Sequence, residues 1–218
     1  MYGRSIVSFI RKERFFLNSR DEAVVRIIKE TYSDIYHESN PHLPQAYYIN
    51  LSSVKAIVIG CDPSNDKGNE FHTVFNLDPD GDERYFNSIN MNLKYIDLCK
   101  SDIYVENLCK NYFNKVTAEN KKWPEIAKLW VPVLKGQLDK LFDNNIPVLA
   151  TSKYVLEGLN KEKCDKFKAY YDKSLFITKE NSKLNRVVIP FFRHWYYSIE
   201  RWSEYLINVK RIINRVDS

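Results

Sequence analysis

Glycine and cysteine are both scarce in this chain, and each scarcity excludes a class of site. Only 6 of the 218 residues are glycine, and none of them forms the GxGxxG or GxxxxGK[ST] loop that cradles nucleotide phosphates. The 4 cysteines lie far apart with no CxxC pair, so their spacing predicts neither a zinc site nor a disulfide framework. We therefore expect no cofactor and no metal, and the cysteine pattern favours a reducing cytoplasm.

Long apolar runs and a strong charge of one sign are also missing. The segment 1–16 interleaves basic residues among its apolar ones, so it lacks the continuous apolar core of a signal peptide. No stretch approaches membrane-spanning length. The net charge of +5 is a mild basic excess that tolerates a polyanion without demonstrating one. We expect a cytoplasmic protein with no membrane partner.

The chain does contain four short apolar runs, each β-branched or aromatic enough to be a buried strand. They are Val54–Gly60, Ile103–Asn107, Ile146–Thr151 and Val187–Phe192. Segments of helical character separate them, and this alternation favours a mainly parallel sheet covered on both faces. We therefore predict an α/β fold, a three-layer sandwich around a four-stranded sheet. One domain over 1–218 is expected, with an N-terminal helical part, about 1–50, packed on it.

Apolar residues at three- and four-residue intervals indicate three helices. The first begins near Ser19 as its cap, and the second runs from about Trp123 to Phe142, with a kink expected at Pro132. The third closes the chain, and Ser198 is its expected cap.

Polar residues stand at the end of every predicted strand. In chain order they are Asp62, Asn107, Thr151 with Ser152, and Arg193 with His194. Ligands of open parallel sheets collect beyond the carboxyl ends of the strands, so a carboxylate, an amide and an imidazole should converge on one edge. Each also has a simpler reading, because Asp62 can start a turn, Asn107 can satisfy backbone groups and His194 can be a hydrogen-bonded core residue. Their joint placement at one edge favours a functional site over these separate structural roles.

The first of these segments, VKAIVIGCDP at Val54–Pro63, resembles the strand and water-activating loop of the uracil-DNA glycosylases, usually VKVVILGQDP. Phe75 falls on the family's base-stacking phenylalanine, and Ile103–Asn107 is similar to its LLLN strand. Val188–His194 sits where the family strand leads to its histidine. The matches follow the family's order over most of the chain. The resemblance implies the α/β/α fold of this superfamily.

The same resemblance implies hydrolysis of the N-glycosidic bond of a base extruded from DNA. Asp62 would orient a water and stabilise cationic character at the sugar C1′, and His194 would hydrogen-bond the leaving base as negative charge develops. Asn107 would separate uracil from cytosine by its hydrogen-bonding edge, and Phe75 would stack on the base. Some relatives hold an iron–sulfur cluster, but the dispersed cysteines offer no compact ligand group, so none is expected here.

Several positions depart from the family pattern. Cys61 replaces a glutamine, and Ser64 stands where a tyrosine excludes the thymine methyl group, so both are expected to line an altered base-binding site. The last loop lacks the family's two prolines, and its expected DNA-contacting residues are Arg193, Tyr196, Tyr197 and Ser198. Tyr196 or Tyr197 would replace the family's wedge leucine or be an ordinary buried or surface aromatic.

Three functions remain open from the sequence. The leading one is a DNA glycosylase, a monomer acting on uracil or a related damaged base in DNA, which the retained Asp62, Asn107, Phe75 and His194 favour. The second is a nucleic-acid or nucleotide-binding protein that keeps the fold with weakened catalysis, which Ser64 and the altered last loop favour. The third is a hydrolase of small nucleosides or nucleotides, because fold does not fix substrate.

Overall fold

The central sheet has four strands in the order β2-β1-β3-β4, and every neighbouring pair is parallel. The structure is a computed structural model that describes residues 19–38, 42–63, 71–78, 81 and 83–215. Its strands are β1 (Ala56–Gly60), β2 (Ile103–Asn107), β3 (Val148–Ala150) and β4 (Val188–Pro190). The predicted α/β class with a four-stranded sheet is confirmed.

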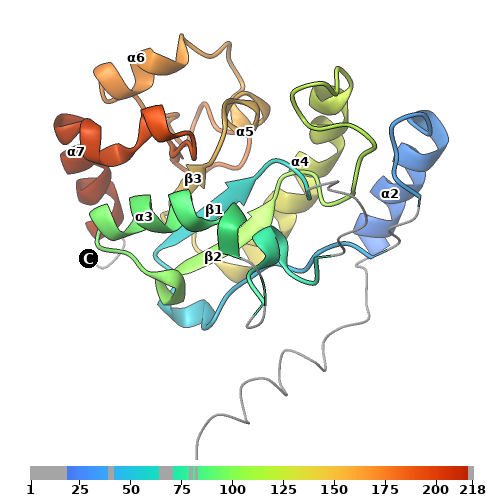
Figure 1. The fold of residues 1–218 in the computed structure, drawn as a ribbon, viewed down its shortest axis with the longest axis horizontal. Helices are drawn as coiled ribbons and strands as arrows, with labels where there is room; N and C mark the ends of the chain where they lie inside the picture. The colour runs from blue at the N-terminus through green and yellow to red at the C-terminus, as the bar shows by residue number, and fades with distance from the viewer. Residues whose placement is uncertain (1–18, 39–41, 64–70, 79–80, 82, 216–218) are drawn as a thin grey trace, which may run out of the picture.

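Six α-helices accompany the sheet in the described part of the chain. They are α2 (Ser19–Thr31), α3 (Asn87–Tyr95), α4 (Trp123–Leu141), α5 (Lys153–Leu159), α6 (Phe167–Asp172) and α7 (Ser203–Asn214). In Figure 1, α2 and α4 lie to one side of the sheet and α3 and α7 to the other, as a three-layer arrangement requires. None of these described helices is both long and apolar enough to cross a bilayer.

Short 3-10 helices link these elements. They are η1 (Leu51–Ser53), η2 (Val74–Asn76), η3 (Glu83–Tyr85), η4 (Lys100–Asp102), η5 (Trp195–Tyr197) and η6 (Ile199–Arg201). The helix predicted to follow Ser198 was placed too early, because η6 comes first and α7 begins only at Ser203. The backbone of Trp202 is non-helical, with φ −125° and ψ 71°, and this separates the two helices. Helix α4 is continuous through the exposed Pro132.

The register of the sheet aligns the carboxyl ends of its strands. Gly60 pairs with Asn107, and Ala150 pairs with Ile59 on one side and with Pro190 on the other. Hydrogen bonds continue past the ends of β3 and β4, where the N–H of Phe191 donates to the carbonyl of Ala150 at 2.8 Å and the N–H of Arg193 donates to that of Thr151 at 3.1 Å. The residues that directly follow the strands therefore emerge at the same edge.

The backbone after β4 is held by two buried tyrosines. Tyr171 of α6 accepts the N–H of Phe192 on its hydroxyl at 2.9 Å, and Tyr205 of α7 donates its hydroxyl to the carbonyl of Pro190 at 2.5 Å. The two tyrosine rings pack together with their centroids 4.6 Å apart. The main chain that leads to Arg193 is thus tied to the core, although the Arg193 side chain is exposed.

Candidate active site

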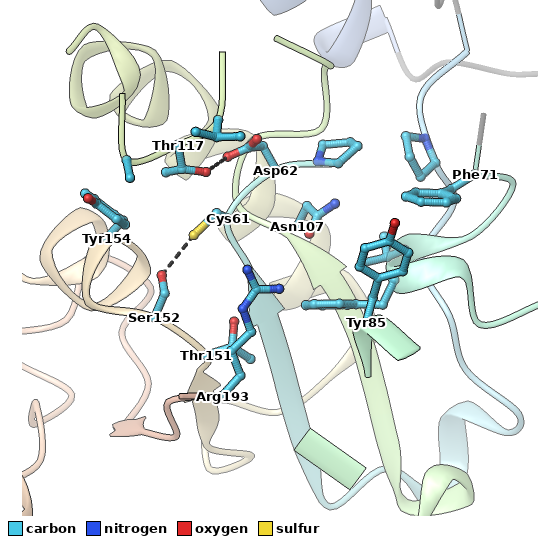
Figure 2. A pocket seen from close by; sticks show the side chains of 16 residues that line it. Cys61, Asp62, Phe71, Tyr85, Asn107, Thr117, Thr151, Ser152, Tyr154 and Arg193 are labelled. Carbon is cyan, nitrogen blue, oxygen red and sulfur yellow. Dashed lines mark hydrogen bonds between the residues drawn. The ribbon is translucent and has the colours of Figure 1, made fainter. Parts of the chain in front are cut away.

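A cavity of about 300 Å³ opens at the carboxyl edge of the sheet. Figure 2 shows side chains from the ends of all four strands facing it, as the register of the sheet predicts. Those from the strand ends are Cys61, Asp62, Asn107, Thr151, Ser152 and Arg193. The structure therefore brings together Asp62, Asn107 and Arg193, which are separated widely in the sequence.

The carboxylate of Asp62 is held by one of its two oxygens. Thr117 donates its hydroxyl to Oδ1 at 2.5 Å, and Trp123 donates its indole N–H to the same atom at 2.8 Å. Oδ2 accepts no hydrogen bond from the residues that the structure describes. The fixed oxygen sets the orientation of the group, and the other is left to interact with a ligand or a water.

Burial raises the pKa of Asp62 to about 6, against the opposing effects of the hydrogen bonds from Thr117 and Trp123 and the positive charge of Arg193. Removal from water penalises the ionised form, whereas donors and a nearby cation favour it. A carboxyl group with this pKa is mostly ionised at neutral pH but can accept a proton readily. That is the property a general base requires.

Asn107 presents an unused carboxamide to the cavity. The residue is only 3% exposed, yet its side chain makes no hydrogen bond with another described residue. A methyl group at Gly60 would lie 2.4 Å from Oδ1 of Asn107 and 2.7 Å from Cζ of Phe75. The absence of a side chain at Gly60 therefore lets the amide and the aromatic ring meet at the base of the cavity.

Phe75 is held in an unusual backbone conformation where it lines the cavity. Its φ of 59° and ψ of 17° lie in the left-handed region, which bulky residues rarely adopt. Its ring makes an edge contact with Phe86, with centroids 5.5 Å apart. Strain of this kind persists where the surrounding structure enforces it, and it concentrates at functional sites.

Further aromatic rings, none of them anticipated from the sequence, line the same space. Phe71 and Tyr85 lie together with centroids 5.5 Å apart, and Tyr154 faces the cavity from α5. Figure 2 shows Phe71 and Tyr85 beyond Asn107, on the far side from Tyr154. Flat apolar walls with polar groups between them suit a planar heterocycle.

Cys61 contributes a neutral thiol. Its Sγ shares a hydrogen bond of 2.9 Å with Oγ of Ser152, which also accepts the N–H of Val155 as the cap of α5. Burial, with the nearby charge of Asp62, raises the pKa of Cys61 to about 12. The thiolate is the nucleophilic form of cysteine, so this residue is a polar wall of the cavity and not a nucleophile at neutral pH.

His194 lies next to the cavity lining but is not part of it. Its side chain is exposed, and its Nδ1 accepts the N–H of Tyr196 at 3.3 Å, which caps η5. Of the expected DNA-contacting residues, Arg193 lines the cavity and Tyr196 is exposed, whereas Tyr197 and Ser198 are partly buried. Ser64 lies outside the described residues.

The aromatic side chains after His194 divide into a buried and an exposed group. Tyr197 packs against the buried rings of Tyr171 and Phe192, with centroids 4.9 and 5.3 Å away. Trp195 is 66% exposed, and the guanidinium of Arg201 lies 4.9 Å from its ring centre. The sequence offers Tyr196 or Tyr197 as the wedge or as an ordinary aromatic, but Trp195 is the most exposed ring of this loop.

A buried ionic cluster lies next to Asn107 and accepts a hydrogen bond from its backbone. Glu106 of β2 is 2% exposed, and its Oε1 accepts the backbone N–H of Asn107 at 2.9 Å. Its Oε2 lies 3.4 Å from Nζ of Lys110, which also lies 3.6 Å from Asp21 and donates to Gln137 at 2.7 Å. Burial acts to lower the pKa of Lys110, but the two carboxylates outweigh it and raise that pKa.

Thr117 and Trp123 hold the carboxylate of Asp62, but neither is among the site residues predicted from the sequence. Thr117 lies in an irregular segment, and its contact with Asp62 spans 55 positions, so no local pattern indicates it. The sequence predicts that a helix begins at about Trp123, but the indole contact with Asp62 depends on how α4 packs.

The sequence matches none of the protein families with which it was compared, and no curated protein is detectably similar to it. Within the described ranges, no group of three or more histidine, cysteine, aspartate or glutamate side chains is placed to hold a metal ion. The described lining of the cavity provides a carboxylate, a carboxamide, a guanidinium and aromatic walls.

Proposed function

We propose that this protein is a DNA glycosylase of the uracil-DNA glycosylase superfamily that hydrolyses the N-glycosidic bond of uracil or a related damaged base. The observation that carries the proposal is the environment of Asp62. One carboxylate oxygen is fixed by Thr117 and Trp123, and the other, beside an aromatic cavity, accepts no hydrogen bond from a described residue. The ordered resemblance along the sequence supports the same conclusion.

In this proposal, Asp62 orients a water molecule through Oδ2. The water oxygen forms a bond to C1′ while the bond from C1′ to the base nitrogen breaks. The electron pair of the broken bond leaves with the base, and the water proton passes to the carboxylate. The negative charge of Asp62 also stabilises the positive character that develops at the sugar.

Base recognition is assigned to Asn107 and Phe75. The carboxamide of Asn107, which no described residue occupies, offers one donor and one acceptor to the edge of a base, and a base with the opposite pattern leaves these buried groups unpaired. Phe75 supplies a ring on which the base stacks. A base reaches such a cavity only when it is extruded from the duplex, so a strained, preformed aromatic wall fits this substrate class.

Single-turnover release of base tests the function. The wild-type protein in excess is mixed with uracil-containing single- and double-stranded oligonucleotides, and free base is measured against time. Asp62→Asn keeps an oxygen for Thr117 and Trp123 but loses the charge, so we expect its rate to fall by about a hundredfold or more. Asp34→Asn removes an exposed carboxylate outside the cavity and should leave the rate unchanged.

The same preparation separates the other two functions. Salt-dependent DNA binding without base release from any substrate indicates a binding protein. Release of base from free nucleosides or nucleotides, with no response to DNA, indicates a small-molecule hydrolase. Either outcome contradicts the proposal.

A further inference from the structure

We infer that Arg193, and not His194, stabilises the negative charge of the departing base. This inference rests on the glycosidase function proposed above and names a further catalytic residue for it. The side chain of Arg193 lines the cavity together with Asp62 and Asn107, and Figure 2 shows its guanidinium directed toward the space between Cys61 and Asn107. His194 follows it directly in the chain but is exposed outside the lining.

The guanidinium of Arg193 is available for a ligand. Among the described residues, no carboxylate lies within ion-pair distance of it and no acceptor binds it. Arg186 shows the contrast, because its side chain is buried and donates to the carbonyls of Leu138 and Phe142 at 3.1 and 2.7 Å. Among the described lining residues, Arg193 is the one that offers a planar cation with five N–H donors to the cavity.

The backbone at Arg193 is nevertheless fixed. Its backbone N–H donates to Thr151 at 3.1 Å, and the preceding Phe192 donates to the hydroxyl of Tyr171 at 2.9 Å. The side chain thus starts from an ordered backbone at the mouth of the cavity. Its positive charge also acts on Asp62, whose pKa it lowers against the larger effect of burial. The guanidinium of Arg193 and the carboxylate of Asp62 therefore interact electrostatically.

The side chain of His194 caps η5 and does not line the cavity. Its Nδ1 accepts the N–H of Tyr196 at 3.3 Å, and its ring lies 5.7 Å from that of Trp195, between centroids. These contacts hold the first turn of η5 beside the cavity. They do not bring the imidazole to the residues that would bind the base.

The chemistry suits a guanidinium. When the bond between C1′ and the base breaks, the electron pair remains on the base nitrogen and is delocalised onto the adjacent carbonyl oxygen. Arg193 donates hydrogen bonds to that oxygen but transfers no proton, since arginine stays protonated throughout the accessible pH range. The base leaves as an anion and takes its proton from solvent. The favoured substrate is therefore a pyrimidine with a carbonyl beside its glycosidic nitrogen.

Single-turnover base release at saturating protein tests the assignment. We expect Arg193→Ala to lower the rate by about a hundredfold, the loss typical of removing one donor to a developing anion, and Arg193→Lys to restore part of it. His194→Asn keeps a capping acceptor for η5 and should change the rate by less than about threefold. Arg26→Ala, an exposed arginine of α2, is the matched control, and thermal unfolding verifies that each variant folds.

A comparison of leaving groups distinguishes catalysis from DNA binding. 5-Fluorouracil is a better leaving group than uracil, so Arg193→Ala should slow its release less than that of uracil. An equal loss for both bases, or a large loss in His194→Asn with little in Arg193→Ala, overturns the assignment while leaving the glycosidase function intact. An inactive wild-type protein overturns both.

Discussion

The indole Nε1 of Trp123 lies 2.8 Å from Oδ1 of Asp62 and joins the first turn of α4 to the loop after β1. Trp123 is 1% exposed, so this donor is fixed by the core. A structural helix thereby sets the orientation and the acidity of the carboxylate that we propose as the general base.

Replacing Trp123 with phenylalanine should move the pH dependence of base release. The wild-type rate should fall as the pH drops through about 6, because protonation of Asp62 removes the base. The indole hydrogen bond favours the ionised form, so its loss raises the pKa of Asp62 and moves the acidic limb to higher pH. Rates measured from pH 4.5 to 9 check the shift. A limb at the same pH in Trp123→Phe contradicts the role given to this contact.

Filling the space at Gly60 should close the base of the cavity. In Gly60→Ala the added methyl group would lie 2.4 Å from Oδ1 of Asn107, so both it and Phe75 must move. We expect base release to fall by at least about tenfold and the free energy of unfolding by about 1–3 kcal/mol. Gly136→Ala meets only the end of the Arg20 side chain, at 3.0 Å, and should leave the rate unchanged. Equal rates in the two variants would contradict the position of the cavity.

The buried cluster around Lys110 should matter for stability far more than an exposed ion pair. Lys110→Met leaves the buried Glu106 and Asp21 without their cation, so we expect a loss of about 3–5 kcal/mol in the free energy of unfolding. The matched change Lys122→Met breaks the exposed pair with Glu125 and should cost about 0–1 kcal/mol. Denaturant unfolding of the two variants measures both values. Similar losses would contradict the expectation that the buried cluster contributes more to stability than the exposed ion pair.

Trp195 should contribute to the binding of single-stranded DNA. Its ring is 66% exposed and begins the turn that follows the cavity lining, so a base next to the extruded one can stack on it. Trp195→Ala should weaken binding of a fluorescent oligonucleotide by about 1–3 kcal/mol, or roughly fivefold to 150-fold. Met91→Ala changes another exposed apolar residue, 60% exposed on α3, and should bind as the wild type does. Unchanged affinity in Trp195→Ala would remove this loop from the DNA-binding surface.

The alternation of apolar runs and helical segments was sufficient to predict the α/β class and the positions of all four strands. Strand β2 has the predicted bounds Ile103–Asn107, because a buried strand of a parallel sheet is apolar on both faces and is therefore visible in the sequence. The start of α7 was not predictable in this way. The same apolar stripe continues through η6, and only the backbone of Trp202 separates the two.

The sequence by itself determined that Asp62, Asn107 and Arg193 lie at one edge, because each directly follows or ends a strand of a parallel sheet. Only the tertiary structure decided which side chains enter the cavity. Thr117 and Trp123 reach Asp62 through contacts that span 55 and 61 positions of the sequence. Consecutive residues after β4 also diverge, because Arg193 lines the cavity and His194 lies outside that lining. Side-chain direction depends on packing and capping contacts that involve residues distant in sequence, such as Tyr171, and these do not appear in any local pattern.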